Sequence, residues 1–283
     1  MPAVRPAAVA GSFYPRESAT LAAEVAGYLA ASHADPSGAP PKAVIAPHAG
    51  YAYSGPIAAS IYARLAPLRG RVRRVVLAGP AHRVYVRGAA IPAAQAFDSP
   101  LGAVALDGDA LAKLRALPFV EVSDAAHARE HSLEVHLPFL QAVLGEFTLV
   151  PVLVGDASVE QAALLLETVW GGTETLVVVS SDLSHYLPYA AARACDGDTA
   201  RAILGLEARL VPEQACGAAP INGLLEARWG RTWRLVFDLI FNLISTWTFP
   251  SSNRNCRVSI RGRYVLTRDS SPQLRTSSGS RNF

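Results

Sequence analysis

The feature that most constrains the fold is a regular alternation between short β-branched runs and longer Ala- and Leu-rich segments. The runs expected to be strands are 42–46, 74–78, 147–154 and 175–180, with a hairpin or an excursion expected over 97–107. The segments expected to be helices are 54–65, 108–117, 159–169, 188–206 and a stretch after Pro212. Strands that alternate with helices predict an α/β fold, a single three-layer domain whose mostly parallel or mixed central sheet is flanked by helices.

The composition excludes a disordered chain, because 51% of the residues are hydrophobic and only 17% are charged. The amino-terminal segment has no apolar run long enough for a signal peptide, and Pro2 and Pro6 interrupt it. The longest apolar stretch, 233–249, is shorter than the roughly 20 residues that a membrane span requires. Three scattered cysteines do not make a disulfide framework. We therefore expect a cytoplasmic protein that contacts no membrane.

The last part of the chain, 228–283, differs from the rest in composition. It contains ten arginines, no lysine and two aspartates, whereas the first 227 residues hold 50 alanines and the tail holds none. A nucleic-acid-binding extension would account for the charge alone. A reading frame that shifts after Ala227 would account for both features, so we adopt it as the hypothesis, with 1–227 as the domain and no nucleic acid bound. The apolar stretch 233–249 would then lie as a helix in the groove left by a missing strand.

Three of the expected strands are followed closely by a histidine. These are His48 after 42–46, His82 after 74–78 and His185 after 175–180. In open α/β sheets, ligands bind beyond the carboxyl ends of the strands, where such residues come together. The spacing therefore indicates a metal or catalytic site, although a single histidine taken alone is more often structural than ligating.

The segment 126–136 adds two pairs of residues four apart, His127 with His131 and Glu130 with Glu134. On a helix each pair would share a face, and two histidines at this spacing can chelate a metal. The alternative is an ordinary helix start, with Glu134 in the first turn where the macrodipole favours an acidic side chain. We favour the helix start, with His131 and Glu134 also facing the site.

Polar side chains beside the histidines could complete a pocket. Asp182 precedes His185 by three residues and could fix the tautomer and raise the basicity of that imidazole. The alternative for Asp182 is a helix cap. Tyr51 and Tyr53 follow His48 and could line the pocket with hydroxyl groups.

Six motifs occur in the order expected of one known family, namely SFYP, APHAGYAYSG, GPAH, EHSLEVHLPFL, SSDLSHY and ACGAAPI. Over 5–227 the chain resembles the Memo family, often labelled AmmeMemoRadiSam system protein B in bacteria and archaea. That family is similar in fold to class III extradiol ring-cleaving dioxygenases, which hold Fe(II) with two His and a Glu. The resemblance implies a mononuclear metal site with the ligands His48, His82 and Cys216. It also implies that His185 is the acid/base group.

The implied ligand set of one thiolate and two imidazoles suits Fe(II) or Cu, with Zn as a further candidate, and does not suit Mg²⁺ or Ca²⁺. We expect a metal-dependent, dioxygenase-like redox enzyme acting on an unknown small molecule. Cys in place of Glu argues against ordinary ring cleavage. The alternative is a non-catalytic binding or adaptor module whose same pocket receives a peptide or a modified side chain. A zinc-dependent hydrolase is a weaker interpretation, because only Glu134 stands in a base position.

Overall fold

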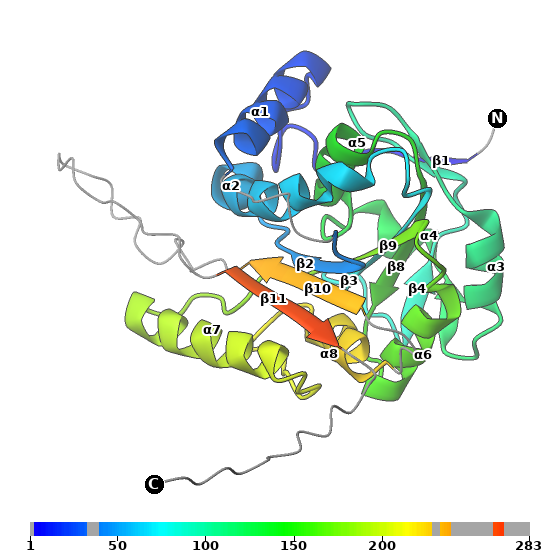
Figure 1. The fold of residues 1–283 in the computed structure, drawn as a ribbon. Helices are drawn as coiled ribbons and strands as arrows, with labels where there is room; N and C mark the ends of the chain where they lie inside the picture. The colour runs from blue at the N-terminus through cyan, green and yellow to red at the C-terminus, as the bar shows by residue number, and fades with distance from the viewer. Residues whose placement is uncertain (1–2, 33–39, 228–232, 239–262, 269–283) are drawn as a thin grey trace, which may run out of the picture.

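The computed structural model describes residues 3–32, 40–227, 233–238 and 263–268. Within these ranges an eight-stranded sheet has the order β11-β10-β2-β9-β3-β8-β4-β7 (Figure 1). Its strands are β2 (Ala43–Ala46), β3 (Arg74–Pro80), β4 (Ala89–Ile91), β7 (Val120–Val122), β8 (Thr148–Val154), β9 (Thr175–Ser180), β10 (Trp233–Asp238) and β11 (Arg263–Arg268). The neighbouring strands from β10 to β8 run parallel, while β4 is antiparallel to β8 and β11 is antiparallel to β10. The sheet is therefore mixed, with a parallel centre.

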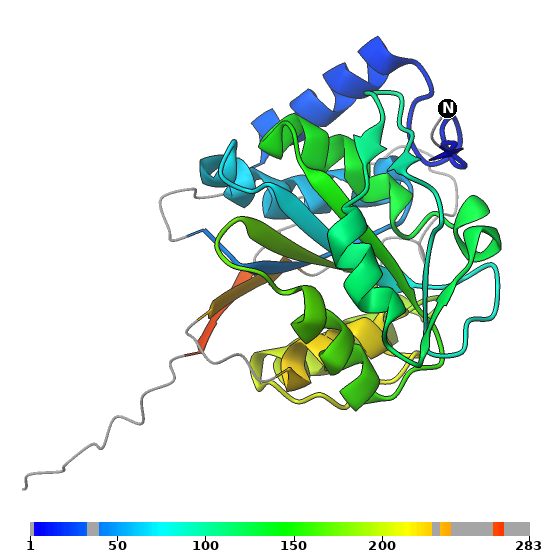
Figure 2. The same cartoon turned by 90° about the vertical axis from the view of Figure 1, so that its right-hand side faces the viewer.

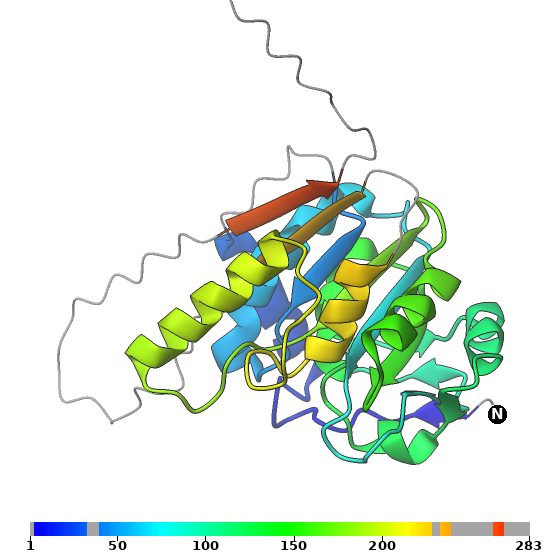
Figure 3. The same ribbon diagram turned by 90° about the horizontal axis from the view of Figure 1, so that it is seen from below.

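Helices cover both faces of the sheet and form the two outer layers (Figures 1 and 2). One face carries α1 (Ser18–Ala31), α2 (Tyr51–Tyr62), the 3-10 helix η1 (Ala63–Leu68) and α5 (Leu137–Leu144). The opposite face, seen in Figure 3, carries α3 (Gly108–Arg115), α6 (Val159–Val169), α7 (Tyr189–Leu204) and α8 (Ala218–Glu226). The connection between β7 and α5 holds α4 (Asp124–Ala128) and the 3-10 helix η2 (Glu134–His136).

The central strands are apolar along their whole length because both of their faces are covered. In β2, Val44 packs into the core under α1 and α2, whereas Ala43 and Ile45 pack into the core on the opposite face. Successive side chains of a strand point to opposite faces, which explains this division. The run of β-branched residues in each strand thus supplies two separate cores at once.

The predicted three-layer α/β fold is confirmed, and the four predicted strands lie where the sequence indicated. A second, three-stranded sheet joins β1 (Val4–Arg5), β5 (Ala96–Phe97) and β6 (Val104–Ala105). Strands β5 and β6 pair in antiparallel fashion, so the hairpin expected over 97–107 is also confirmed.

The helix start expected within 126–136 is confirmed at Glu134, where η2 leads directly into α5 and places Glu134 in the first turn, but the residues before it are not helical. Helix α4 ends at Ala128, and the residues up to the short η2 are irregular. The Glu130 side chain accepts hydrogen bonds from the backbone N–H groups of His131 and Ser132 at 2.9 and 3.0 Å. These bonds compete with the backbone bonds of a helix, so the four-residue pairs in this segment do not share a helical face.

Part of the Arg-rich tail lies in the sheet as strands. Residues 233–238, expected to be helical, form β10 in parallel pairing with β2. Without β10, β2 would be an edge strand with a row of unpaired backbone N–H and C=O groups. β10 pairs with these groups. The expectations for 228–232, 239–262 and 269–283 lie outside the described residues. Among the helices of the described ranges, none has both the length and the apolar character needed to cross a bilayer.

Candidate metal centre

Three histidines from separate segments converge beyond the carboxyl ends of β2 and β3. His48 follows β2, His82 follows β3, and His131 comes from the irregular stretch after α4. One ring nitrogen of each lies within 4.8 Å of the corresponding nitrogens of the other two. The ring centroids are 5.0 Å apart for His48 and His82, and 4.8 Å apart for His82 and His131. This group can hold a metal ion.

The three rings differ in their access to solvent. The His48 side chain is 2% exposed, whereas the side chains of His131 and His82 are 13% and 29% exposed. The centre is therefore closed on the side of the sheet and open on the side of His82. An open side is typical of sites that admit a substrate, unlike closed structural sites.

The thiol of Cys216 lies next to His48, beside the three-histidine group. Its Sγ lies 3.2 Å from His48 Nε2 and accepts a hydrogen bond from the backbone N–H of Asp182 at 3.3 Å. Burial, and after it the charge of Asp182, raises the pKa of the Cys216 thiol to about 12. The predicted ligands His48 and Cys216 thus lie in contact, although they are 168 residues apart in the chain.

Glu130 orients the His82 ring and lies beside the His131 ring, a role that the sequence reasoning missed. Its Oε1 lies 3.1 Å from His82 Nδ1 and 3.2 Å from His131 Nδ1, and its Oε2 accepts from the His82 backbone N–H. Burial alone would raise the pKa of Glu130, but the hydrogen bonds from His82 and Ser132 outweigh it and lower the pKa to about 2. An ionised carboxylate only accepts, so it holds the His82 proton on Nδ1 and leaves Nε2 free.

Burial also favours the neutral form of two histidines of the cluster, His48 and His131. It lowers the pKa of His48 well below the usual value, and the neighbouring His82 and His131 rings lower it further. The pKa of His131 is lowered chiefly by burial as well. Neutral imidazoles and a thiol form a donor set that fits Fe, Cu or Zn.

Asp182 lies between two imidazoles at the mouth of the centre. Its Oδ2 is 3.8 Å from His48 Nε2 and 3.9 Å from His185 Nε2. The His185 side chain is 37% exposed, so this ring stands at the rim where it meets both solvent and Asp182. Tyr53, at 47% exposure, lies on the surface in the first turn of α2.

Two residues expected to line the pocket lie in the protein interior instead. Tyr51 is 2% exposed, and its hydroxyl donates a hydrogen bond to the Val135 carbonyl at 2.7 Å. Glu134 is fully buried, and its carboxylate pairs with Arg5. The expectation for Glu134 failed because its carboxylate, in the first turn of η2, meets Arg5 and the amino-terminal backbone rather than the site. The alternative of a His127–His131 chelate fails too, because His127 is buried against Phe97 and bonds the Ala90 carbonyl.

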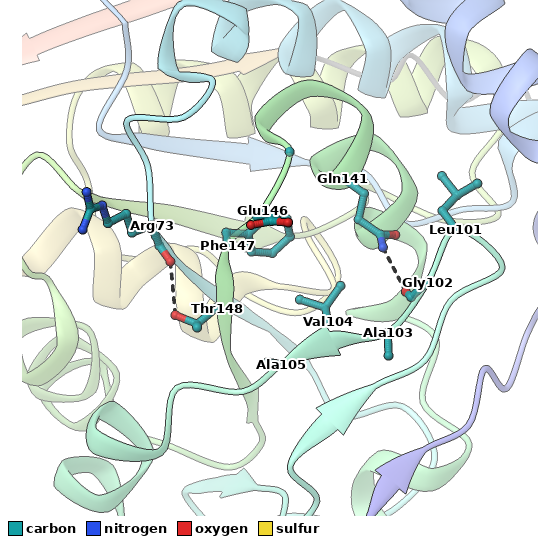
Figure 4. A pocket seen from close by; sticks show the side chains of 11 residues that line it. Arg73, Leu101, Gly102, Ala103, Val104, Ala105, Gln141, Glu146, Phe147 and Thr148 are labelled. Carbon is teal, nitrogen blue, oxygen red and sulfur yellow. Dashed lines mark hydrogen bonds between the residues drawn. The ribbon is translucent and has the colours of Figure 1, made fainter.

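A surface cavity of about 650 Å³ lies elsewhere, around Phe147 and Thr148 where β8 begins (Figure 4). The three-histidine cluster follows the opposite ends of the strands parallel to β8, so the cavity and the cluster are separate. In this cavity Thr148 donates to the Arg73 carbonyl and Gln141 donates to the Gly102 carbonyl. Its lining contains no histidine or cysteine and Glu146 as its one carboxylate, so it lacks the donors of the cluster.

Gly217 allows the Cys216 segment to approach β9 closely. A Cβ atom at this position would lie 2.4 Å from the Ser180 carbonyl oxygen and 2.6 Å from the Ser181 Cβ. We expect Gly217→Ala to destabilise the protein by about 1–3 kcal/mol, typical of overpacking, and to weaken metal binding by displacing Cys216. Urea unfolding of the metal-free protein measures the first effect, and metal titration measures the second.

The matched control is Gly27→Ala in α1, where an added Cβ meets nothing within 4 Å. Alanine is a better helix former than glycine, so this variant should be more stable than the parent by roughly 0.5–1 kcal/mol. Equal stability of the Gly217→Ala variant and the parent would show that the segment can move away from β9 at no cost.

Comparison with known proteins places the chain among one group of relatives. A family model described as Memo-like protein matches residues 5–225. A MEMO1 family protein of Aquifex aeolicus is 36% identical over 68% of this chain and 72% of its own length. Another, from Methanococcoides burtonii, is 35% identical over 79% of this chain and 87% of its own length. An uncharacterized protein of known structure from Escherichia coli K12 aligns with a TM-score of 0.36 at 15% identity, over 62% of this chain and 83% of its own.

Proposed function

The chain belongs to the Memo family, and we propose that it is a mononuclear metal-dependent redox protein whose ion is held by His48, His82 and Cys216. The observation that carries the proposal is the convergence of the histidine nitrogens on one point, with the Cys216 thiol 3.2 Å from His48 Nε2. Fe(II) and Cu match this donor set best, and Zn is a further candidate. His131 offers an additional nitrogen to the same ion.

The other residues at the mouth would act on a bound substrate. When bound, the ion supplies a Lewis acid and, if it is Fe or Cu, an electron-transfer centre. His185 would donate or accept a proton at Nε2, since it lies at the rim and is accessible to solvent. Asp182 would hold that ring toward the centre, because its Oδ2 lies between the His185 and His48 nitrogens.

Exposed aromatic residues favour a second candidate function, a non-catalytic binding module that receives a peptide or a modified side chain. Tyr186, next to His185, is 91% exposed and has a left-handed backbone φ of 58°. Tyr53 is 47% exposed beyond His48. Exposed tyrosines suit contact with a peptide, because they present a large apolar ring and a polar hydroxyl.

The two functions share the metal and differ in turnover. The protein is purified anaerobically, freed of metal and titrated separately with Fe(II), Cu(I) and Zn(II). We expect one ion per chain, and oxygen consumption by the Fe or Cu form in the presence of reductant if it is an oxidoreductase. Failure to bind any of the three ions would reject both the redox protein and a metal-dependent binding module. Binding of one ion without oxygen consumption would favour the binding module.

The pH dependence of binding identifies the third ligand. With its pKa near 12, the Cys216 thiol is protonated in the metal-free protein and must lose that proton to ligate. His48 and His131 are already neutral, because their pKa values lie below the usual range. Metal affinity should therefore rise about tenfold per pH unit between about pH 7 and 9, with one proton released per ion. Calorimetry in two buffers of different ionisation enthalpy counts this proton.

In Cys216→Ser the slope and the released proton should both disappear. The matched control is Cys195→Ser in α7, outside the cluster, which should keep the slope of the parent. An unchanged slope in Cys216→Ser would exclude thiolate ligation and favour a centre of three histidines with His131 as the third ligand.

A further inference from the structure

Four buried side chains form a continuous line of hydrogen bonds behind the metal centre. Tyr62 Oη lies 2.7 Å from His136 Nδ1, and His136 Nε2 lies 2.8 Å from Ser180 Oγ. Ser180 Oγ in turn lies 2.6 Å from His48 Nδ1. Each of these residues is 2% exposed or less, so no bulk solvent reaches the line. It runs from Tyr62 at the end of α2, through η2 and the end of β9, to the His48 ring next to Cys216.

The direction of these bonds follows from one further contact. The Ser180 hydroxyl donates its proton to the Ser132 carbonyl at 2.5 Å, and a carbonyl oxygen can only accept. A serine hydroxyl has one proton and two lone pairs, so both imidazoles must donate to Ser180 Oγ. The proton of His48 is therefore on Nδ1, and the proton of His136 that faces Ser180 is on Nε2.

The far end of the line is consistent with this assignment. Burial, and after it the neighbouring His48, lowers the pKa of His136 to about 3, so the His136 ring is neutral. A neutral ring with its proton on Nε2 has an acceptor at Nδ1, and the Tyr62 hydroxyl can donate to it. Every bond in the line then has one donor and one acceptor.

We propose that Ser180, supported by His136 and Tyr62, is a positioning residue that fixes His48 as the Nδ1–H tautomer and keeps Nε2 available to a metal. Glu130, in the irregular stretch after α4, holds the proton of His82 on Nδ1 in the same way, but it does so with a charged carboxylate as the acceptor. For His48, at 2% exposure, the neutral hydroxyl avoids burying another carboxylate. This proposal rests on the proposed metal-binding function, but the tautomer itself exists without metal.

The tautomer can be observed directly in the metal-free protein by NMR with ¹⁵N-labelled histidine. The His48 signals are assigned by their absence from a His48→Gln variant. We expect His48 Nε2 to show the shift of an unprotonated ring nitrogen and Nδ1 that of a protonated one. The opposite pattern in the parent protein would overturn the proposal, whether or not the protein binds metal.

The variant that tests the role is Ser180→Ala, which removes the acceptor of the His48 Nδ1 proton. We expect part of the His48 population to change to the Nε2–H tautomer and the Zn(II) affinity to fall about 10- to 100-fold, as is typical for loss of a partner behind a ligand. The control is Ser60→Ala in α2, a buried serine whose hydroxyl bonds the Ile57 carbonyl of its own helix. It should change neither quantity.

The outcomes separate this role from a structural one and from failure of the proposed function. Unchanged tautomer and affinity in Ser180→Ala would overturn the proposal. If Ser180→Ala does not fold, the tautomer of the parent decides alone. If the parent binds no metal while His48 is the Nδ1–H tautomer, the metal function fails and the hydrogen-bond assignment stands.

Discussion

Replacing His48 with alanine should abolish high-affinity metal binding, with a loss of more than about 100-fold. Partners behind a ligand are worth roughly 10- to 100-fold in metal affinity, so loss of the ligating nitrogen itself should cost more. His48 is the member of the cluster that lies beside both another histidine, His82, and the thiol of Cys216. Its ring centroid lies 5.0 Å from that of His82, and its Nε2 lies 3.2 Å from the Cys216 sulfur. Isothermal titration of the metal-free variant with Fe(II) and Zn(II) measures the loss.

The control for this variant is His185→Ala, which removes an imidazole from the rim and leaves the cluster complete. His185 contacts Asp182 at 3.9 Å and lies outside the three-histidine group. The His185→Ala variant should bind one ion with an affinity within a few-fold of the parent, and it should lose turnover if the protein is an enzyme. Full metal binding by a folded His48→Ala variant, checked by circular dichroism, would move the centre elsewhere in the protein.

The sequence predicted the parts of the centre that depend on strand ends. Apolar runs of the right length identify parallel strands, and in a parallel sheet the residues after neighbouring strands meet at one edge. His48 and His82 come together for this reason. Their positions follow from β2 and β3 alone, and no knowledge of the loops is needed.

The loop residues of the centre could not be predicted in the same way. Glu130 and His131 reach the cluster because Glu130 replaces helix hydrogen bonds with bonds from its own side chain. A spacing of four residues suggested a helical face, and spacing does not reveal such local competition. The one available signal was the adjacency of a carboxylate and a histidine in EHS, next to a serine that can also use its backbone N–H.

The contacts of Glu134 could not be predicted from local spacing either, because its partners are far away along the chain. Its partners Arg5 and Tyr14 come from the first residues of the chain, 129 and 120 positions away. Spacing within 126–136 contains no information about them. Tyr14 lies within the SFYP motif that carried part of the family resemblance, but the resemblance did not specify its contact with Glu134.

Removing the Glu134 carboxylate should cause the largest loss of stability among the variants considered. The side chain is fully buried and pairs with Arg5, which is 6% exposed. It also accepts hydrogen bonds from the backbone N–H groups of Ala8 and Val9 at 2.7 and 2.9 Å, and from the Tyr14 hydroxyl. Breaking a buried ion pair from one side leaves an uncompensated charge and costs about 3–5 kcal/mol. We expect Glu134→Ala to lower the free energy of unfolding by that amount, measured by urea denaturation.

The loss should extend to the metal centre, because Glu134 anchors the segment that packs on His131. Phe13 lies in that segment, with its ring centroid 4.7 Å from that of His131. The surface control is Glu121→Ala on β7, an exposed carboxylate whose removal should change stability by no more than about 0.5 kcal/mol.

Adding Arg5→Met to Glu134→Ala removes the stranded charge and should restore part of the lost stability. The backbone donors of Ala8 and Val9 remain without the carboxylate in either variant, so recovery should be incomplete. A double variant no more stable than Glu134→Ala would show that backbone bonds, including those that Arg5 donates to the His127 and Glu130 carbonyls, hold the amino-terminal segment rather than the ion pair. A Glu134→Ala variant as stable as the parent would mean that neither the backbone bonds nor the ion pair of Glu134 stabilises the amino-terminal segment.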